Sequence, residues 1–325
     1  MPSMRAMQIK SLDGPDALEL AEAPVPESRG RVLIEVHAAG VCFADLLMTR
    51  GRYQFRPEPP FTPGVELAGV VRSAPEGSPF TPGDRVAASS PLGAWAEYAL
   101  AAPHVTFRIP DEMSFATATA LINYQTAYFS IVERGQGRAG EAVLVHGAAG
   151  GVGSAAVDVA RALGMEPIAI ARGEEKLAVA RELGAAHAFD AESEWLAEVR
   201  RVTNDRGVDI VVDTVGGERF LDSVRALAPA GRLLVVGFAA GEIPSVKVNR
   251  LLLRNTSVVG AAWAEYIRHD PEMPQRVAKG LAELWDAGAI HPLLGPAFPL
   301  ERAADALREI EGRRAMGKVV LTVRE

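Results

Sequence analysis

Residues 142–164, AVLVHGAAGGVGSAAVDVARALG, constrain the fold of this chain more than any other stretch. An apolar β-branched run, Ala142–Val145, leads into a cluster of four glycines, after which the spacing predicts a helix from Ser154 to Leu163. A glycine turn between a strand and a helix lets the backbone approach a pyrophosphate, which the free N–H groups and positive dipole end of the helix attract. Such a glycine pattern is informative only at a strand-to-helix junction, and it stands at one here. We therefore predict a dinucleotide-binding α/β unit.

The pattern of strands and helices changes at residue 142. Strand-like runs alternate beyond it with helical stretches, and this indicates βαβ units on a parallel sheet with strand order 3-2-1-4-5-6. We predict strands at Pro167–Ala171, His187–Phe189, Val208–Asp213, Arg232–Gly237 and Ser257–Gly260, and helices at Glu174–Leu183, Ser193–Thr203, Glu218–Leu227 and Pro274–Ala287. Before residue 142, short runs broken by Gly and Pro predict a β-rich domain: Arg31–Ala38, Gly64–Arg72 and Asp84–Ala88. A helix is predicted to start at Ser114. Near the end of the sequence, Gly317–Val323 predicts a closing strand.

Composition excludes several function classes. The net charge of −7 in 325 residues argues against a general nucleic-acid binder, which needs a basic surface. Cys42 is the one cysteine, so neither an intramolecular disulfide nor a multi-cysteine zinc site can form. The start, MPSMRAMQIK, lacks the apolar core of a signal peptide, and the longest uncharged run, Met113–Val132, is too polar to span a membrane. We expect a soluble cytoplasmic protein without nucleic-acid or membrane partners.

The residues after the second predicted strand of the α/β unit indicate which nicotinamide cofactor binds. An NAD site places an acidic residue at the end of this strand to bind the ribose hydroxyls, but Ala171 stands there. Arg172 and Lys176 follow, and both can meet a 2′-phosphate. NADPH is therefore favoured over NADH. NADH stays open as an alternative if Glu174 or Glu175 reaches back to the ribose.

The chain resembles the medium-chain dehydrogenase/reductase superfamily, and within it the zinc-free NADPH:quinone oxidoreductase (zeta-crystallin-like) branch. The segments that carry the resemblance are AAGVCFAD (38–45), RGRY (50–53), PFTPGVELAGVV (60–71), PGDRV (82–86), NYQTAY (123–128), the GAAGGVG loop, RELGA (181–185), DTVGG (213–217), VVGFAAGEIP (235–244) and GKVVL (317–321). The implied fold class is α/β, with a GroES-like β-rich catalytic domain and a doubly wound parallel Rossmann sheet. We assign 1–122 to the catalytic domain, 123–264 to the Rossmann NADPH-binding domain and 265–325 to a C-terminal segment that returns to the catalytic domain.

The metal-ligand positions of the zinc-containing relatives are altered. Cys42 occupies the first position, but Val65 stands where those relatives have histidine, and no second cysteine exists. A catalytic zinc needs three protein ligands, so we expect none. Without a Lewis acid, the acceptor must already be electrophilic. We therefore expect hydride transfer to a quinone, or alternatively enoyl or alkenal reduction of an α,β-unsaturated carbonyl. A different class, an NADPH-binding structural or regulatory protein with little turnover, also fits the cofactor site.

The resemblance also implies roles for single residues. Cys42, where this branch usually carries Asn, and Tyr53, which would line the substrate cleft, are the catalytic candidates; His146 is interpreted as a core residue. Because the thiol would lie near the nicotinamide, we predict that NADPH protects Cys42 from alkylation by a quinone. The cofactor-binding candidates are Asn123 and Thr126 (nicotinamide end), Gly150, Gly151 and Val152 (pyrophosphate), Arg172 and Lys176 (2′-phosphate), and, without a more specific role, Phe43, Thr214, Val215, Phe238, Ala239, Trp263 and Lys318.

An apolar, β-branched stretch, Asn255–Ala262, predicts the edge strand of the parallel sheet. An exposed edge carries unpaired N–H and C=O groups and invites pairing. Two such edges related by a twofold axis would join two sheets into one. We therefore predict a homodimer, which the resemblance also implies.

Overall fold

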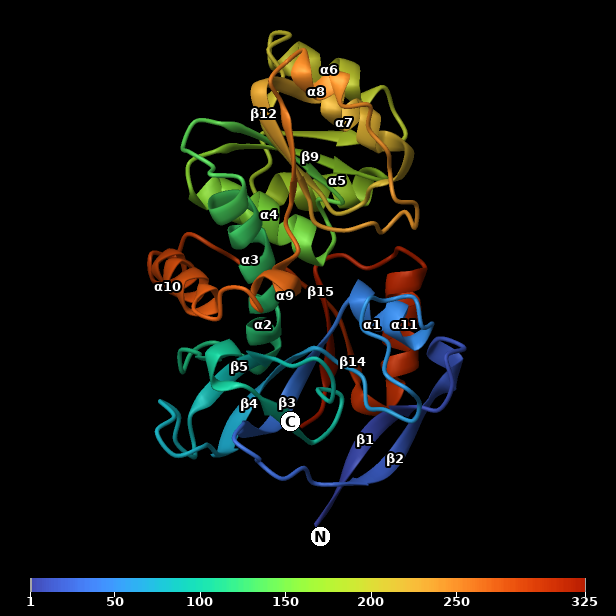
Figure 1. Cartoon of the computed structure of the whole chain (residues 1–325), viewed down its shortest axis with the longest axis vertical. Coiled ribbons are helices and arrows are strands. Elements are labelled where there is room, and N and C mark those ends of the chain that lie inside the picture. Colours follow the sequence, from blue (N-terminus) through green and yellow to red (C-terminus); the bar gives the residue numbers. More distant parts are fainter. Residues whose placement is uncertain (1, 325) are drawn as a thin grey trace. The chain divides into compact units, whose positions relative to one another are not determined.

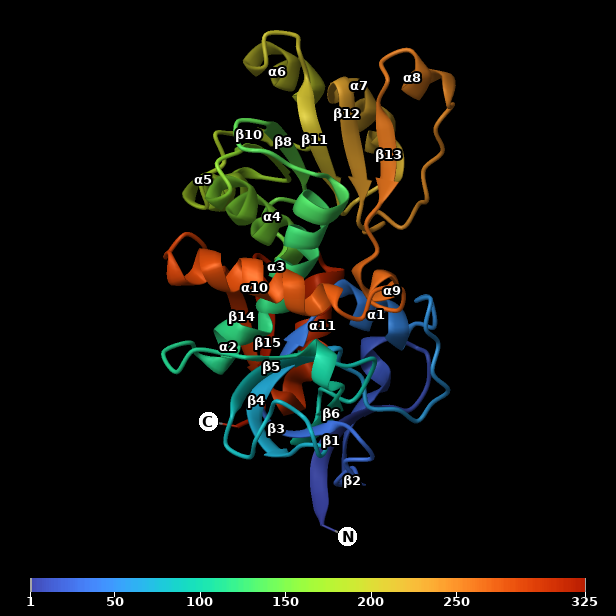
Figure 2. The ribbon, with the colours of Figure 1, turned by 60° about the vertical axis from the view of Figure 1, so that its left-hand side comes forward.

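The strands predicted between residues 142 and 260 form one parallel sheet of six strands (Figure 1). In the computed structural model, which describes residues 2–324, the order is β10-β9-β8-β11-β12-β13, which confirms the predicted order 3-2-1-4-5-6 counted from β8. The strands are β8 (Ala142–His146), β9 (Glu166–Ala171), β10 (His187–Asp190), β11 (Val208–Asp213), β12 (Leu227–Val235) and β13 (Ser257–Gly260). Figure 2 shows β13 at one outer edge of this sheet, with the segment that carries α8 (Asn249–Leu252) beside it.

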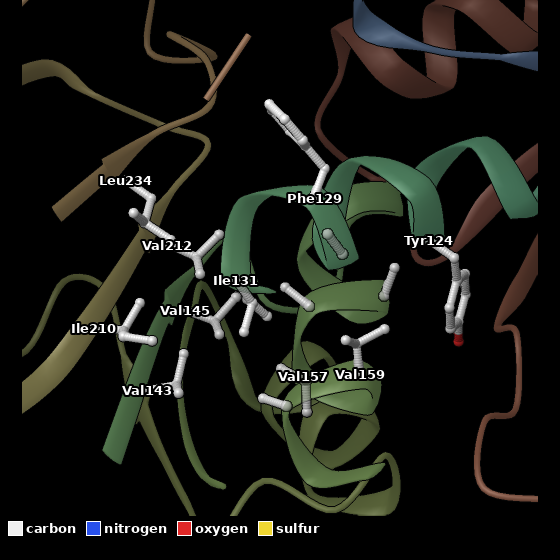
Figure 3. Packing of buried hydrophobic residues seen from close by; sticks show 14 of the residues in the cluster. Tyr124, Phe129, Ile131, Val143, Val145, Val157, Val159, Ile210, Val212 and Leu234 are labelled. Carbon is white, nitrogen blue, oxygen red and sulfur yellow. The ribbon is translucent and has the colours of Figure 1, made fainter. Parts of the chain in front are cut away.

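Helices cover both faces of the sheet because alternate side chains of each strand point to opposite sides. Val143 and Val145 of β8 belong to one core cluster, whereas Leu144 belongs to another. The first cluster packs against α3 (Leu121–Tyr128), the π-helix η3 (Phe129–Arg134), α4 (Gly151–Ala162), α5 (Glu174–Glu182), α9 (Trp263–Tyr266) and α10 (Met273–Asp286); Figure 3 shows its centre. The second packs against α6 (Trp195–Val202) and, after the 3-10 turn η4 (Gly217–Arg219), α7 (Phe220–Ala226).

Four helices begin at positions other than those predicted; α6 starts two residues later, at Trp195, and α10 one residue earlier, at Met273. α4 starts at Gly151, three residues before the predicted Ser154, so the glycines form its first turn. α7 begins at Phe220 because a 3-10 turn precedes it, and Leu227 already belongs to β12. Ser114 is confirmed as a helix N-cap, since its side chain accepts a hydrogen bond from the N–H of Thr117 at 3.0 Å.

The remaining residues form a β-rich unit around a seven-stranded sheet in the order β14-β15-β3-β4-β5-β7, with β6 also paired to β3. A separate hairpin joins β1 to β2. The strands are β1 (Ser3–Ile9), β2 (Leu18–Pro24), β3 (Val32–Val41), β4 (Glu66–Ser73), β5 (Arg85–Ser89), β6 (Tyr98–Ala101), β7 (Thr106–Arg108), β14 (Leu294–Pro299) and β15 (Lys318–Thr322). The helices are α1 (Phe43–Thr49), α2 (Phe115–Thr119) and α11 (Ala303–Glu311), with 3-10 turns at Pro15–Ala17, Pro103–Val105 and Leu300–Arg302.

The chain divides into two units whose boundaries differ in part from those predicted. Unit 1 comprises 1–122 and 293–325, and unit 2 comprises 123–292. Residues 265–292 therefore belong to unit 2, and only 293–325 return to unit 1. The physical reason is that α10 buries Val277 and Leu281 in the core cluster of the parallel sheet. No helix within residues 2–324 is long and apolar enough to cross a membrane.

Candidate functional site

The glycine turn of unit 2 brings the start of α4 close to the end of β8. Gly147 has a φ of 65°, which favours glycine. A Cβ at Gly153 would lie 2.6 Å from the carbonyl carbon of Gly147, so no side chain fits there. Gly150 is the N-cap residue and has no side chain to cap the helix. The first N–H groups of α4 therefore form a cradle that suits a phosphate group.

The two predicted cations, Arg172 and Lys176, lie in the turn after β9 and at the start of α5. Arg172 follows the last residue of β9, and its Nε lies 2.9 Å from Oε1 of Glu192. Asp190, the last residue of β10, accepts a hydrogen bond from the N–H of Gly173 at 2.7 Å. Hydrogen bonds from backbone N–H groups lower the pKa of Asp190, so this carboxylate is ionised at neutral pH. Lys176 is half-buried on α5, near the same turn.

The loops after β11 and β12 are hydrogen-bonded to each other at the same edge of the sheet. Thr214 Oγ1 donates to the carbonyl of His146 at 3.0 Å, and the N–H of Ala239 donates to the carbonyl of Thr214 at 3.2 Å. The buried carboxylate of Asp213 accepts hydrogen bonds of 2.8 Å from both Val215 and Gly216. Asp213 was not predicted as a site residue; an acidic residue that ends a buried strand before a glycine pair was the available signal. Three predicted residues, Thr214, Val215 and Ala239, thus lie together.

The remaining predicted cofactor-binding residues of unit 2 fall into two groups. Asn123 is 6% exposed on α3, and a methyl group at Gly151 would collide with its amide, so α3 lies against the glycine turn. Thr126 and Phe238 are half-buried. Trp263 is 8% exposed and packs its ring 5.2 Å from that of Phe129, which makes it a core residue. A cofactor contact of Trp263 stays a prediction.

His146 is buried, as interpreted from the sequence. Its Nε2 lies 2.8 Å from Ser223 Oγ, and its ring meets Trp195 edge-on at 5.2 Å. Because Ser223 Oγ also donates to the carbonyl of Arg219, the imidazole is the donor toward this hydroxyl. Burial lowers the pKa of His146, which keeps the ring neutral at pH 7.

Cys42 of unit 1 is the N-cap residue of α1, and both its backbone N–H and its thiol donate to the carboxylate of Asp45. Asp45 Oδ2 accepts hydrogen bonds from the Cys42 N–H at 2.9 Å and from its Sγ at 3.1 Å. Burial raises the pKa of Cys42 to about 12 and that of Asp45 to about 6. The thiol is therefore protonated at neutral pH and a poor nucleophile. This differs from the sequence prediction of a thiol that quinones alkylate.

A buried ion pair joins Lys318 of β15 to Glu66 of β4. The two residues are 2% and 4% exposed, and Lys318 Nζ contacts Glu66 Oε2. Burial lowers the pKa of Lys318. The predicted cofactor contact of Lys318 stays a prediction, because the observed partner of its ammonium is Glu66. Phe43 and Tyr53 are half-buried in the same unit.

Comparison with known proteins identifies the family. Residues 28–111 match the alcohol dehydrogenase GroES-like domain, and residues 151–282 match the zinc-binding dehydrogenase family. Quinone oxidoreductase-like protein 2 of Rattus norvegicus is 38% identical over 306 residues, which cover 93% of this chain and 87% of that protein. The chain belongs to the medium-chain dehydrogenase/reductase superfamily, in its quinone oxidoreductase branch.

Two solved structures of medium-chain dehydrogenase/reductase type are similar over their whole length. A probable oxidoreductase from Mycobacterium abscessus shares 44% identity with a TM-score of 0.91, and the match covers 99% of each chain. The quinone oxidoreductase from Thermus thermophilus, also solved in complex with NADPH, shares 37% identity with a TM-score of 0.83. That match covers 98% of this chain and 100% of the Thermus chain.

The residues present do not fit the zinc that one family name implies. Among residues 2–324, no group of three or more His, Cys, Asp and Glu side chains could hold a metal ion. The position of the histidine ligand holds Val65, and the Glu66 carboxylate already contacts the ammonium of Lys318. The cradle at α4, in contrast, suits a dinucleotide. The glycine turn of unit 2 is therefore the candidate cofactor site.

Proposed function

We propose that this chain is an NADPH-dependent oxidoreductase that reduces a quinone or a similar electrophilic acceptor without a metal. The observation that carries the proposal is the pairing of two features in unit 2: a phosphate cradle at the start of α4, and Ala171 in place of an acid at the end of β9, followed by Arg172 and Lys176. The names of the relatives support it, because the quinone oxidoreductases of Homo sapiens and Thermus thermophilus share 33% and 37% identity with the chain over 98% of its length. NADPH, when bound, supplies the hydride.

Each part of the cofactor has a proposed set of partners. The pyrophosphate is assigned to Gly150, Gly151 and Val152. The N–H groups of Gly151 and Val152 lie in the first turn of α4, where no side chain caps the helix, whereas the N–H of Gly150 donates to the carbonyl of Gly147 at 2.9 Å and would have to exchange that partner for the phosphate. Arg172 and Lys176 bind the 2′-phosphate, and a guanidinium can do so with two hydrogen bonds. At the nicotinamide end we propose Asn123 and Thr126 from α3 and, from the loops after β11 and β12, Thr214, Val215, Phe238 and Ala239.

We propose that the acceptor carries its own electrophilicity, because the zinc positions lack ligands. Quinones and activated enones meet this condition, and the phenolate formed from a quinone can take its proton from water. Tyr53 remains the proposed substrate contact of unit 1. Cys42 keeps its place as a candidate near the acceptor, as a neutral thiol hydrogen-bonded to Asp45.

A panel of quinones and enones tests this proposal. The loss of NADPH absorbance is followed with each acceptor, before and after treatment with a strong chelator, and the metal content of the purified protein is measured. We expect turnover with quinones that survives chelation. Turnover with enones alone would favour the enoyl or alkenal reductase alternative, and activity lost to chelator and restored by zinc would contradict the metal-free proposal.

We also propose a homodimer formed through β13. This strand pairs only with β12 among the described residues. The N–H of Ala261 donates to Val235 of β12, so by alternation the N–H of Val258 points away from the sheet. The large hydrophobic side chains exposed by more than 70% lie just before β13: Ile243, Val248, Leu252 and Leu253. A second copy would cover both the apolar side chains and the open edge.

The cytoplasm remains the proposed compartment, since a lone cysteine suits a reducing environment.

A further inference from the structure

Arg172, the first residue after β9, already has an ionic partner. Its Nε lies 2.9 Å from Oε1 of Glu192, and the two side chains are 53% and 61% exposed. A phosphate group from solution therefore has access to the same guanidinium. Glu192 lies two residues after the end of β10, and β10 is the strand that pairs with β9.

The backbone holds Glu192 beside Arg172. Asp190 accepts the N–H of Glu192 through Oδ1 and the N–H of Gly173 through Oδ2, both at 2.7 Å. The N–H of Ala191 donates to the carbonyl of Ala171 at 2.8 Å. The hydrogen bonds of Gly173 and Ala191 join the ends of β9 and β10, and that of Glu192 closes the turn after β10. The Glu192 backbone thus stays fixed relative to the turn that carries Arg172.

We propose that Glu192 is a specificity-determining residue that reduces the preference of this chain for NADPH over NADH. The inference rests on the proposed function, in which Arg172 binds the 2′-phosphate. A phosphate carries a charge of about −1.5 to −2 at pH 7. When it binds Arg172, it lies beside the Glu192 carboxylate, and both anions share one guanidinium. NADH has no 2′-phosphate and does not meet this repulsion.

The test replaces Glu192 with Gln, which keeps the size of the side chain and removes its charge. Dissociation constants for NADPH and NADH are measured by titration of the full-length variant, together with those of 2′,5′-ADP and 5′-AMP. Exposed ion pairs are worth little, so we expect the NADPH dissociation constant to fall about two- to five-fold while that of NADH changes less than about two-fold. The gain should shrink at high salt, because exposed charges are screened.

Glu198→Gln is the matched control. Glu198 forms a similarly exposed ion pair with Arg201 at 2.8 Å on α6, so the variant makes the same change in net charge away from Arg172. It should leave the NADPH dissociation constant within about two-fold. An equal gain in both variants would show that only net charge matters, and would overturn the role of Glu192.

Two further outcomes would overturn the inference. If Glu192→Gln leaves NADPH binding unchanged or weakens it, the carboxylate does not compete with the phosphate. If it weakens NADH, Glu192 accepts hydrogen bonds from the ribose instead. Arg172→Ala separates the two levels of the argument. If Arg172→Ala leaves the NADPH dissociation constant unchanged, the assignment of the 2′-phosphate in the proposed function fails; if it raises that constant while Glu192→Gln gives no gain, only the role of Glu192 fails.

Discussion

Replacing Gly153 by alanine places a methyl group against the backbone of the glycine turn. The new Cβ would lie 2.6 Å from the carbonyl carbon of Gly147 and 3.0 Å from Cα of Ala148, and nearer still to the Gly147 oxygen. Carbon atoms pack best at about 3.5–4.0 Å. The start of α4 and the end of β8 must therefore separate by about 1 Å. All three obstructing atoms belong to the backbone, so no side-chain rotation can relieve the contact.

The cost follows from this geometry. Forcing extra carbon into a packed site costs about 1–3 kcal/mol, and a clash with backbone alone indicates the upper end. The better helix propensity of alanine returns at most about 1 kcal/mol. We expect the free energy of unfolding to fall by about 2 kcal/mol, with a fall in Tm of about 4–8 °C for a unit of this size. NADPH affinity should fall as well, because the displaced N–H groups are the proposed pyrophosphate donors.

Denaturant unfolding of the full-length protein, followed by far-UV circular dichroism, and NADPH titration measure the two effects. Gly150→Ala is the matched control for stability, because its Cβ would meet its nearest neighbour, the Gly147 oxygen, at 3.3 Å, with an ordinary φ of −79°. We expect its free energy of unfolding to stay within about 0.5 kcal/mol of the wild type. Equal stability of Gly153→Ala and Gly150→Ala would refute the close-approach argument.

The remaining predictions concern Asp45, Cys42 and Val258. Burial raises the Asp45 pKa from 3.8 to about 6, so its stabilising contribution is complete below about pH 4 and is lost as the pH rises through 6. The stability difference between wild type and Asp45→Asn should therefore fall by about 2.5 kcal/mol from pH 4 to pH 7, and a constant difference in denaturant unfolding at the two pH values would contradict this. With its pKa raised to about 12, Cys42 should resist alkylation by a quinone at pH 7 both with and without NADPH, as measured by mass spectrometry; rapid modification of the cofactor-free protein would show an ionised, accessible thiol. Val258→Pro should remove an outward N–H from β13 and weaken the dimer while preserving the monomer fold, which light scattering and circular dichroism would check; a wild type that is monomeric at micromolar concentration would rule out the dimer.

The order of the parallel strands and the place of the glycine turn followed from local patterns. Strand and helix periods depend on residues a few positions apart, and right-handed crossovers leave few ways to connect alternating strands and helices. The glycines before α4 and the cations after β9 could be read in the same way, since each lies at a strand end. The absence of a histidine at Val65 was also visible in the sequence alone.

The limits of unit 2 depended on contacts between distant segments. Residues 265–292 were assigned to the C-terminal segment, yet α10 packs on the core that also contains Phe129 and Trp263. The amphipathic pattern of a helix in the sequence does not indicate which core its apolar face packs against. For the same reason the sequence did not reveal that Trp263, a predicted cofactor-binding candidate, is buried in this core.

The charge state and partners of the polar residues were decided only by the tertiary structure. Lys318 and Glu66 are far apart in the chain but form a buried pair, and Arg172 meets Glu192 because β9 and β10 are neighbours. Burial raises the pKa of the Cys42 thiol to about 12, well above that of a free cysteine. The sequence by itself determined which chemical groups stand at the ends of which strands. Their partners and pKa values required the folded chain, because desolvation and ion pairing depend on residues that meet only after folding.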